Sequence, residues 1–127
     1  MCAVSGNTVK FVGVGTCTLT PSATATANYT AVTGAPQSFA VGKATPTIYI
    51  GNIPTNAVRG GSFVPVFNYS GNGTPVESVT SFTPSVCAVS GNTVKFLASG
   101  NCTLKASATS TADYTAVTGP SQNFKVK

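Results

Sequence analysis

The sequence predicts an all-β fold with two packed layers, a β-sandwich, and three observations lead to this prediction. Apolar residues alternate with polar ones over short runs, as in strands that bury one face. Gly, Pro and Asn separate these runs, and no run has the period of an amphipathic helix. The 42% hydrophobic content, with β-branched residues throughout, favours a packed core over a disordered chain.

An internal repeat with a constant offset of 85 residues sets the domain organisation. Residues 2–42 align without a gap with residues 87–127, and twenty-eight of the forty-one pairs are identical. Self-similarity at a fixed period is typical of tandem arrays. We therefore expect residues 44–127 to form one complete unit, and residues 1–43 to be the second half of a preceding, incomplete unit.

The joint between the two units, residues 42–46, is very short. If the first and last strands of a sandwich leave at opposite ends, such a joint cannot fold back to close one domain on itself. Residues 44–86 are therefore expected to pair with residues 87–127 and not with residues 1–43.

About seven strands are expected in the complete unit. One of them, 62–69, places Phe63, Pro65, Phe67 and Tyr69 on the same face, and Pro65 predicts an edge strand or a bulge because it lacks an N–H donor. The seven ranges are 47–50, 62–69, 76–82, 86–89, 93–97, 102–108 and 122–126.

The half-unit is expected to contain the counterparts of three of these strands. One lies around residues 9–12, another begins at Cys17, and a closing strand covers residues 37–41. Phe39 and Val41 are expected to face inward in the closing strand.

Four cysteines fall into two pairs of identical spacing, Cys2 with Cys17 and Cys87 with Cys102. Pairing within each repeat is the simplest arrangement and predicts two disulfides, with two buried free thiols per repeat as the alternative. The spacing, without a nearby His or third Cys, does not fit a metal site. Disulfides would indicate an oxidising compartment, so we expect an extracellular or cell-surface location.

The remaining composition argues against catalysis and against several classes of ligand. The chain has no His and only two carboxylates, Glu77 and Asp113, and Asp113 aligns with Asn28 in the other copy. We expect no enzyme activity, no cofactor and no metal, calcium included, because such sites need more carboxylates or a base. The net charge of +5 is spread along the chain, which argues against nucleic-acid binding. No apolar run is long enough for membrane insertion.

Two weaker candidate sites follow from single residues. An isopeptide bond between a Lys and an Asn would need a buried acid, for which Glu77 is the candidate; Lys95 is the candidate lysine, although its position in the alternation points it outward. Tyr29 and Tyr114 occupy the same place in both copies and are expected to plug the end of the sandwich. The alternative for these tyrosines is a ligand-binding role.

Three motifs in order, SVCAV (85–89), TVKF (93–96) and GNCTL (100–104), resemble the bacterial immunoglobulin-like (BIG2-type) repeat domains of large surface proteins and adhesins of the intimin and invasin type. In that family a SVATV strand, a short hydrophobic strand and a GTATIT strand follow in the same order. The copy GTCTL (15–19) is similar to the last element as well. The chain departs from the family in carrying Cys87 and Cys102 at positions where small residues are usual.

The resemblance implies an immunoglobulin-like β-sandwich that serves as a structural module of a bacterial fibre, stalk or adhesin. With the predicted disulfides, we expect a rigid spacer whose partners are the adjacent repeats of the same protein. The alternatives are an adhesive binding module and a self-assembling filament unit. In the latter, the exposed sheet edges of residues 1–43 would be joined to other copies by strand complementation.

Overall fold

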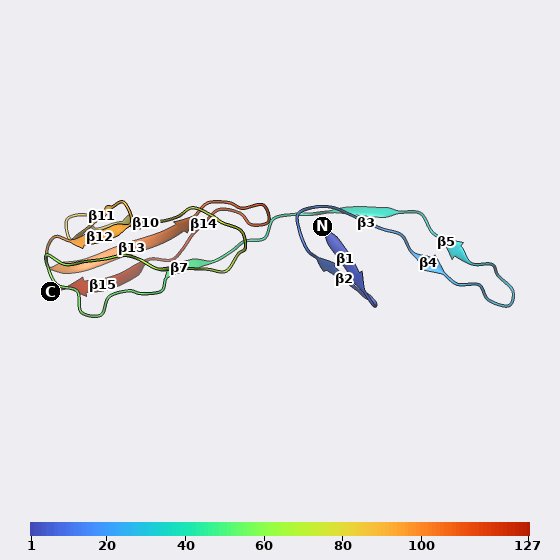
Figure 1. The fold of residues 1–127 in the computed structure, drawn as a ribbon, viewed down its shortest axis with the longest axis horizontal. Coiled ribbons are helices and arrows are strands. Elements are labelled where there is room, and N and C mark those ends of the chain that lie inside the picture. The colour runs from blue at the N-terminus through green and yellow to red at the C-terminus, as the bar shows by residue number, and fades with distance from the viewer. The chain divides into compact units, whose positions relative to one another are not determined.

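The computed structural model describes all residues from 1 to 127 and contains fifteen strands and no helix (Figure 1). The chain divides into two compact units, Met1–Lys43 and Ala44–Lys127. Every pairing between named strands is antiparallel, so the protein is all-β with several antiparallel sheets.

Three sheets make up the larger unit, residues 44–127, and they enclose one core in a sandwich-like arrangement (Figure 1). The largest sheet has β13 at its centre, paired with β10, β14 and β15, while β11, β12 and β8 form a second sheet and β7 pairs with β9. The bounds are β7 Ile48–Ile50, β8 Ser62–Phe63, β9 Phe67–Tyr69, β10 Glu77–Ser81, β11 Cys87–Ser90, β12 Thr93–Phe96, β13 Gly100–Ala108, β14 Val117–Thr118 and β15 Gln122–Val126.

The core lies on the inner face of β13, and the alternation of the sequence explains why. Along this strand Cys102, Leu104, Ala106 and Ala108 are buried, whereas the three intervening residues carry hydroxyl or amino groups and remain partly accessible. A strand points successive side chains to opposite faces, so this pattern gives one apolar face and one polar face. The alternation of apolar and polar residues from which a β fold was predicted is thus present in this strand.

The hairpin between β11 and β12 follows from its turn residues. Ser90 pairs with Thr93, which leaves Gly91 and Asn92 as the two-residue turn. Gly91 has a φ of 62°, a left-handed conformation that glycine adopts without steric cost and that hairpins of this length require. The copy at Gly6 has a φ of 61°, so the same two residues, Gly and Asn, make the same turn in both units.

The expected strand 62–69 is divided in the structure into two strands that belong to different sheets. β8 pairs with β12, and β9 pairs with β7. Between them the Asn52 side chain takes the place of a strand partner, donating to the Val64 carbonyl at 2.8 Å and accepting from the Val66 N–H at 2.7 Å. The alternation holds across the break, because Pro65 is buried while Val64 and Val66 are exposed. Together with the unexpected β14, this break gives nine strands where about seven were expected.

Gly119 allows the backbone of β7 to approach the segment that follows β14. A Cβ at this position would overlap the carbonyl oxygen of Ile48, and the Gly119 N–H donates to the Ala106 carbonyl at 2.8 Å. Because the overlapped Ile48 oxygen belongs to the backbone, it cannot rotate away as a side chain could. We expect Gly119→Ala to lower the free energy of unfolding by about 1–3 kcal/mol, measured by urea denaturation followed by circular dichroism.

Gly42→Ala is the matched control for that substitution. A Cβ on Gly42 would have no heavy atom within 4 Å, and its backbone is not left-handed. This variant should be within about 0.5 kcal/mol of the wild type. Equal losses for the two alanine variants would contradict the close backbone contact as the cause.

The smaller unit, residues 1–43, contains three separate two-stranded sheets. β1 pairs with β2, β3 with β6, and β4 with β5. The single long strand β13 of the larger unit corresponds here to β3 and β4, which are separated at Pro21, the residue aligned with Ala106. The bounds are β1 Cys2–Ser5, β2 Thr8–Phe11, β3 Gly15–Leu19, β4 Ser22–Ala23, β5 Val32–Thr33 and β6 Gln37–Val41.

Candidate functional site

Both predicted disulfides are present, and each joins two different sheets of its unit. Cys87 on β11 is bonded to Cys102 on β13, with 5.7 Å between the Cα atoms. Cys2 on β1 is bonded to Cys17 on β3, with 5.6 Å between the Cα atoms. No free cysteine remains, so the alternative of buried free thiols is wrong. Two disulfides indicate an oxidising, extracellular type of environment.

The Cys87–Cys102 disulfide lies in the interior of the larger unit. Both residues have 0% of their surface exposed, and both belong to the buried core cluster. The Ser81 hydroxyl donates to the Cys87 carbonyl at 2.6 Å, which ties the end of β10 to the start of β11. The disulfide is thus an internal cross-link between layers and offers no surface for a redox partner.

The two residues considered for an isopeptide bond lie on different sheets. Glu77 is in β10, on the same face as the buried Val79, and its Oε2 atom is buried without a hydrogen-bond partner. Lys95 is exposed in β12 between the buried Val94 and Phe96. Glu77 thus faces the interior and Lys95 faces solvent, and the structure does not bring them together.

The two aligned tyrosines differ in their surroundings. Tyr114 is half-buried, and its ring meets that of Tyr69 edge to face with 6.4 Å between centroids. Its backbone also forms a bridge with Ala44 at the start of the unit. Tyr29 is 79% exposed, because residues 1–43 contain no counterpart of Tyr69. An end-plugging place is therefore available to Tyr114 and not to Tyr29.

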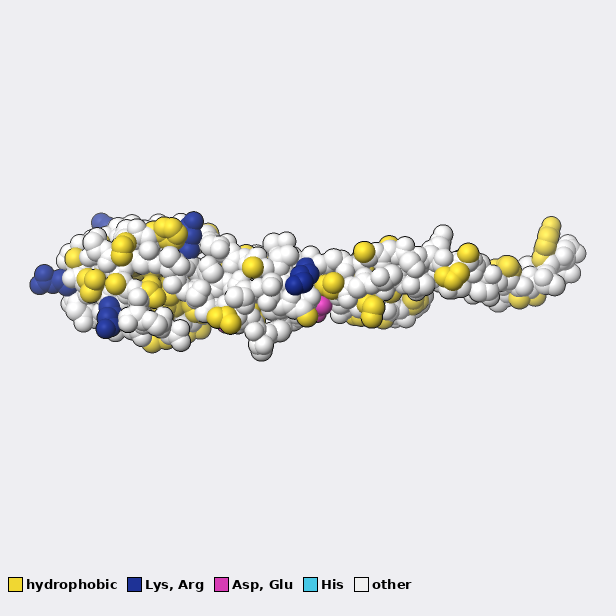
Figure 2. Space-filling model, turned by 90° about the horizontal axis from the view of Figure 1, so that it is seen from above, with side chains coloured by type: hydrophobic (Ala, Val, Ile, Leu, Met, Phe, Trp, Pro, Cys, Tyr) yellow, Lys and Arg dark blue, Asp and Glu magenta, His cyan; other side chains and the backbone are white.

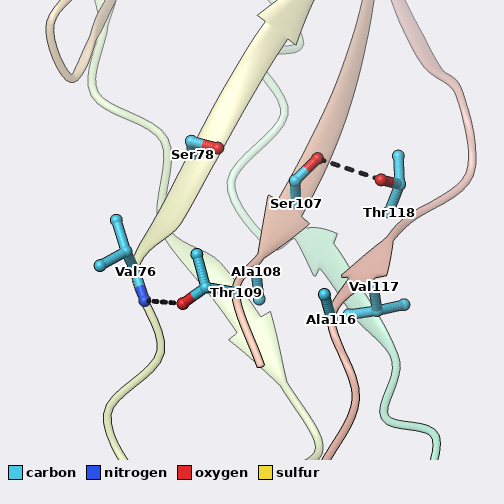
Figure 3. A pocket seen from close by; sticks show the side chains of 8 residues that line it. All are labelled: Val76, Ser78, Ser107, Ala108, Thr109, Ala116, Val117 and Thr118. Carbon is cyan, nitrogen blue, oxygen red and sulfur yellow. Dashed lines mark hydrogen bonds between the residues drawn. The ribbon is translucent and has the colours of Figure 1, made fainter. Parts of the chain in front are cut away.

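A shallow pocket of about 320 Å³ lies on the outer face of β10, β13 and β14 (Figure 3). Among the residues that line it, Ser107 and Thr118 share a hydroxyl hydrogen bond of 3.4 Å, and the Val76 N–H donates to the Thr109 hydroxyl at 2.8 Å. No charged or titratable side chain lines this pocket. Its hydroxyl and methyl groups can offer hydrogen bonds and small apolar contacts to a neutral ligand.

The smaller unit exposes the apolar face that the larger unit buries. Phe11 is 65% exposed and Phe39 is 41% exposed, whereas their counterparts Phe96 and Phe124 are 5% and 7% exposed. Phe39 was expected to face inward, and it does lie against Phe11, with 5.8 Å between the ring centroids. Few residues of this unit cover the pair, so both rings remain accessible to solvent.

One residue missed by the sequence interpretation fastens β7 to β15. The Gln122 side chain accepts from the Ile50 N–H at 2.8 Å and donates to the Ile50 carbonyl at 3.0 Å. A side-chain amide can satisfy both backbone groups of one residue, as a strand partner would. The sequence signal was the identity of Gln122 and Gln37 at the start of the last strand in both copies.

Neither a dense patch of positive charge nor a cluster of metal ligands is found. Lys and Arg side chains lie scattered over the face seen in Figure 2, without a dense patch. No group of three or more His, Cys, Asp or Glu side chains is placed to hold a metal ion. The structure contains no helix of the length and apolar character needed to cross a membrane.

Comparison of the chain with protein-family models, with curated proteins and with solved structures finds no significant match.

Proposed function

We propose that the chain is part of a tandem array of immunoglobulin-like units that acts as a rigid, disulfide-stapled spacer. The array would belong to a secreted or cell-surface bacterial fibre, stalk or adhesin. The internal repeat supports the array, and the motifs around Cys87 and Cys102 that resemble bacterial immunoglobulin-like repeats support the family and the source.

The observation that carries this proposal is that the larger unit begins and ends at opposite ends of its longest strand. Ala44 pairs with Tyr114, beyond the Ala108 end of β13, while Val126 pairs with Gly100 at the other end of the same strand. A nine-residue strand is about 30 Å long, so the entry and exit points are separated by about that distance. In a tandem array, the chain would enter such a unit at one end of this strand and leave it at the other, as a spacer requires.

The disulfides support the rigid character of the spacer. An 84-residue unit has a small core, and small extracellular domains are commonly cross-linked for that reason. Closing a loop of about fifteen residues contributes about 3 kcal/mol in the chain-entropy model, a large part of a typical domain stability of about 5–15 kcal/mol.

Small-angle X-ray scattering on lengthened chains tests the spacer. The 127-residue chain would be extended at its C-terminus by one, two or three further copies of residues 43–127. We expect the maximum dimension to rise by equal steps of at least about 30 Å per copy. A matched series with ten-residue Gly/Ser linkers between copies should give unequal steps that shrink as copies are added, because such linkers let the units bend relative to each other. A dimension that levels off in the directly joined series would contradict the proposal.

The pocket on β10, β13 and β14 favours one second candidate, an adhesive module for a neutral, hydroxyl-rich ligand such as a glycan. Its Ser and Thr hydroxyls supply donors and acceptors, and Val76 and Val117 supply apolar contact. A glycan array probed with the whole chain would reveal such binding. Reproducible binding that is lost in Ser107→Val and retained in the exposed, distant Lys95→Gln would favour this candidate over the spacer.

A further inference from the structure

The face that residues 1–43 leave uncovered closely repeats a face that residues 87–127 have covered, with Pro21 in place of the buried Ala106 as the exception. At eight inward positions the two copies carry identical side chains. In the larger unit, residues 44–86 supply the cover, and they include the buried Ile48 and Ile50 of β7. The eight pairs are Cys2/Cys87, Val4/Val89, Val9/Val94, Phe11/Phe96, Cys17/Cys102, Leu19/Leu104, Phe39/Phe124 and Val41/Val126.

An aromatic cluster shows what is missing from the smaller unit. Phe63 on β8 lies against both Phe96 and Phe124, with ring centroids 5.9 and 5.8 Å apart, and those two rings are 5.6 Å apart. Phe11 and Phe39 reproduce the last pair at 5.8 Å without a third ring. Residues 1–43 thus already hold the counterparts of Phe96 and Phe124 in contact. No ring occupies the position that corresponds to Phe63.

The smaller unit also carries the side chain for one polar contact that the larger unit makes. Gln122 binds the N–H and the carbonyl of Ile50 through its side-chain amide. Gln37 occupies the same position at the start of β6 and is exposed. Gln37 can therefore bind the backbone of a strand that runs as β7 does.

Two strand edges of the smaller unit are open where the larger unit has partners. β12 pairs with β8 on one side, and its counterpart β2 pairs only with β1. β13 pairs with β10, and its counterpart β3 pairs only with β6. Exposed edges of this kind accept further strands through backbone hydrogen bonds.

Pro21 does not block the open edge of β3. In the larger unit, the hydrogen bonds at the two ends of the β10–β13 pairing fall on odd-numbered residues on the β13 side: the Phe82 N–H donates to the Thr103 carbonyl, and the Thr109 N–H donates to the Val76 carbonyl. Ala106, the counterpart of Pro21, faces the other side, where its carbonyl accepts from Gly119. The N–H that proline lacks is therefore not one that an added strand would use.

We infer that residues 1–43 are an acceptor for a second polypeptide segment with the sequence pattern of residues 44–86, supplied by another half-repeat of the array. This inference rests on the proposed array for the source of the segment. The incoming segment places a Phe against Phe11 and Phe39 and adds one strand beside β2 and another beside β3. A further strand, the equivalent of β7, hydrogen-bonds through its backbone to the Gln37 side-chain amide. The product is a second closed unit like residues 44–127.

Counting half-units excludes a second copy of this chain as the occupant. Residues 1–127 contain two acceptor halves, residues 1–43 and 87–127, and one covering segment, residues 44–86. A copy that lends its covering segment opens its own residues 87–127. Exchange of covering segments between copies of residues 1–127 therefore always leaves one uncovered acceptor half for each copy. Only a covering segment from outside these residues can cover that half.

A synthetic peptide of residues 44–86 added to the whole 127-residue chain tests the inference. Fluorescence anisotropy of the labelled peptide should show saturable binding with one peptide per chain. Hydrogen-exchange mass spectrometry should show new protection in β2, β3 and β6. The chain's own covering segment is held at a millimolar effective concentration, so micromolar peptide should leave residues 87–127 unchanged.

Variants on both sides sharpen this test. A peptide carrying Phe63→Ala should bind at least about tenfold more weakly, because it leaves the aromatic site empty. Gln37→Ala in the chain should weaken binding of the wild-type peptide by about tenfold, through two lost hydrogen bonds. Gln122→Ala, the same change in the closed unit, is the matched control and should leave peptide binding unchanged.

Three outcomes would overturn the inference. The first is absence of peptide binding, and the second is protection confined to residues 44–127. The third is association of the chain with itself that rises with concentration, protects β2 and β3, and is not reduced by added peptide. A second copy of the chain would then be the occupant. The scattering series of directly joined units does not depend on peptide docking, so the failure of this inference can be told apart from the failure of the proposed spacer.

Discussion

Phe96→Ala is expected to lower the free energy of unfolding of residues 44–127 by about 3–5 kcal/mol. Phe96 is 5% exposed, and its ring contacts Phe63 from β8 and Phe124 from β15. Truncation removes the apolar surface buried by the ring and leaves a cavity between two sheets that cannot collapse around it. Urea denaturation followed by circular dichroism measures the loss, and Phe96→Leu, which keeps much of the volume, should lose clearly less.

Phe11→Ala is the matched control for this substitution, because the same residue stands at the same strand position in the smaller unit. Phe11 is 65% exposed and contacts one aromatic ring, Phe39. Its truncation should cost less than about 1 kcal/mol, detected as faster hydrogen exchange in residues 1–43 only. Similar losses at the two positions would contradict the difference in burial between the units.

Replacing both Cys87 and Cys102 by alanine is expected to lower the stability of the larger unit by about 3 kcal/mol. The disulfide closes a loop with a sequence separation of 15, and its loss restores conformational freedom to the unfolded chain. Thermal and urea denaturation with and without dithiothreitol measure the effect. Reductant should bring the wild type down to the stability of the variant and should leave the larger unit of the variant unchanged.

Cys2→Ala with Cys17→Ala provides the comparison in the smaller unit. The sequence separation is again 15, so the effect on the unfolded chain is the same, but the unit around it buries far fewer side chains. We expect residues 1–43 to lose their hydrogen-exchange protection while residues 44–127 retain theirs. For the larger unit, the contradicting outcome concerns Cys87 and Cys102. If the variant lacking both were as stable as the wild type under oxidising conditions, the disulfide would have no stabilising role.

Much of this fold could be predicted because its signals are local or repeated. The alternation along β13 gives its buried face directly, and the glycine in the turn before β12 predicts the hairpin. The identical spacing of Cys2 with Cys17 and of Cys87 with Cys102 indicates the pairing within each copy. In each case the residues concerned lie within about twenty positions of each other, where strand period and turn geometry determine the outcome.

The features that could not be predicted depend on individual side chains that bind, or fail to find, a partner in another segment. The division of the strand 62–69 requires the Asn52 side chain to bind the segment around Pro65. The backbone contact of Gln122 is made 72 residues away, at Ile50. Neither follows from composition or period. The exposure of Tyr29 likewise depends on the absence of a partner and not on the tyrosine itself.

The cross-link between β11 and β13 has a mechanical consequence for a chain that is pulled from its two ends. Tension that enters at Ala44 and leaves at Lys127 passes through the sulfur bridge, so the segment between Cys87 and Cys102 carries no load. The sequence separation of 15 means that about 50 Å of chain, at the usual extended spacing, cannot be pulled out while the disulfide is intact. An unfolded unit would therefore lengthen by about 50 Å less under tension than the same unit without the cross-link.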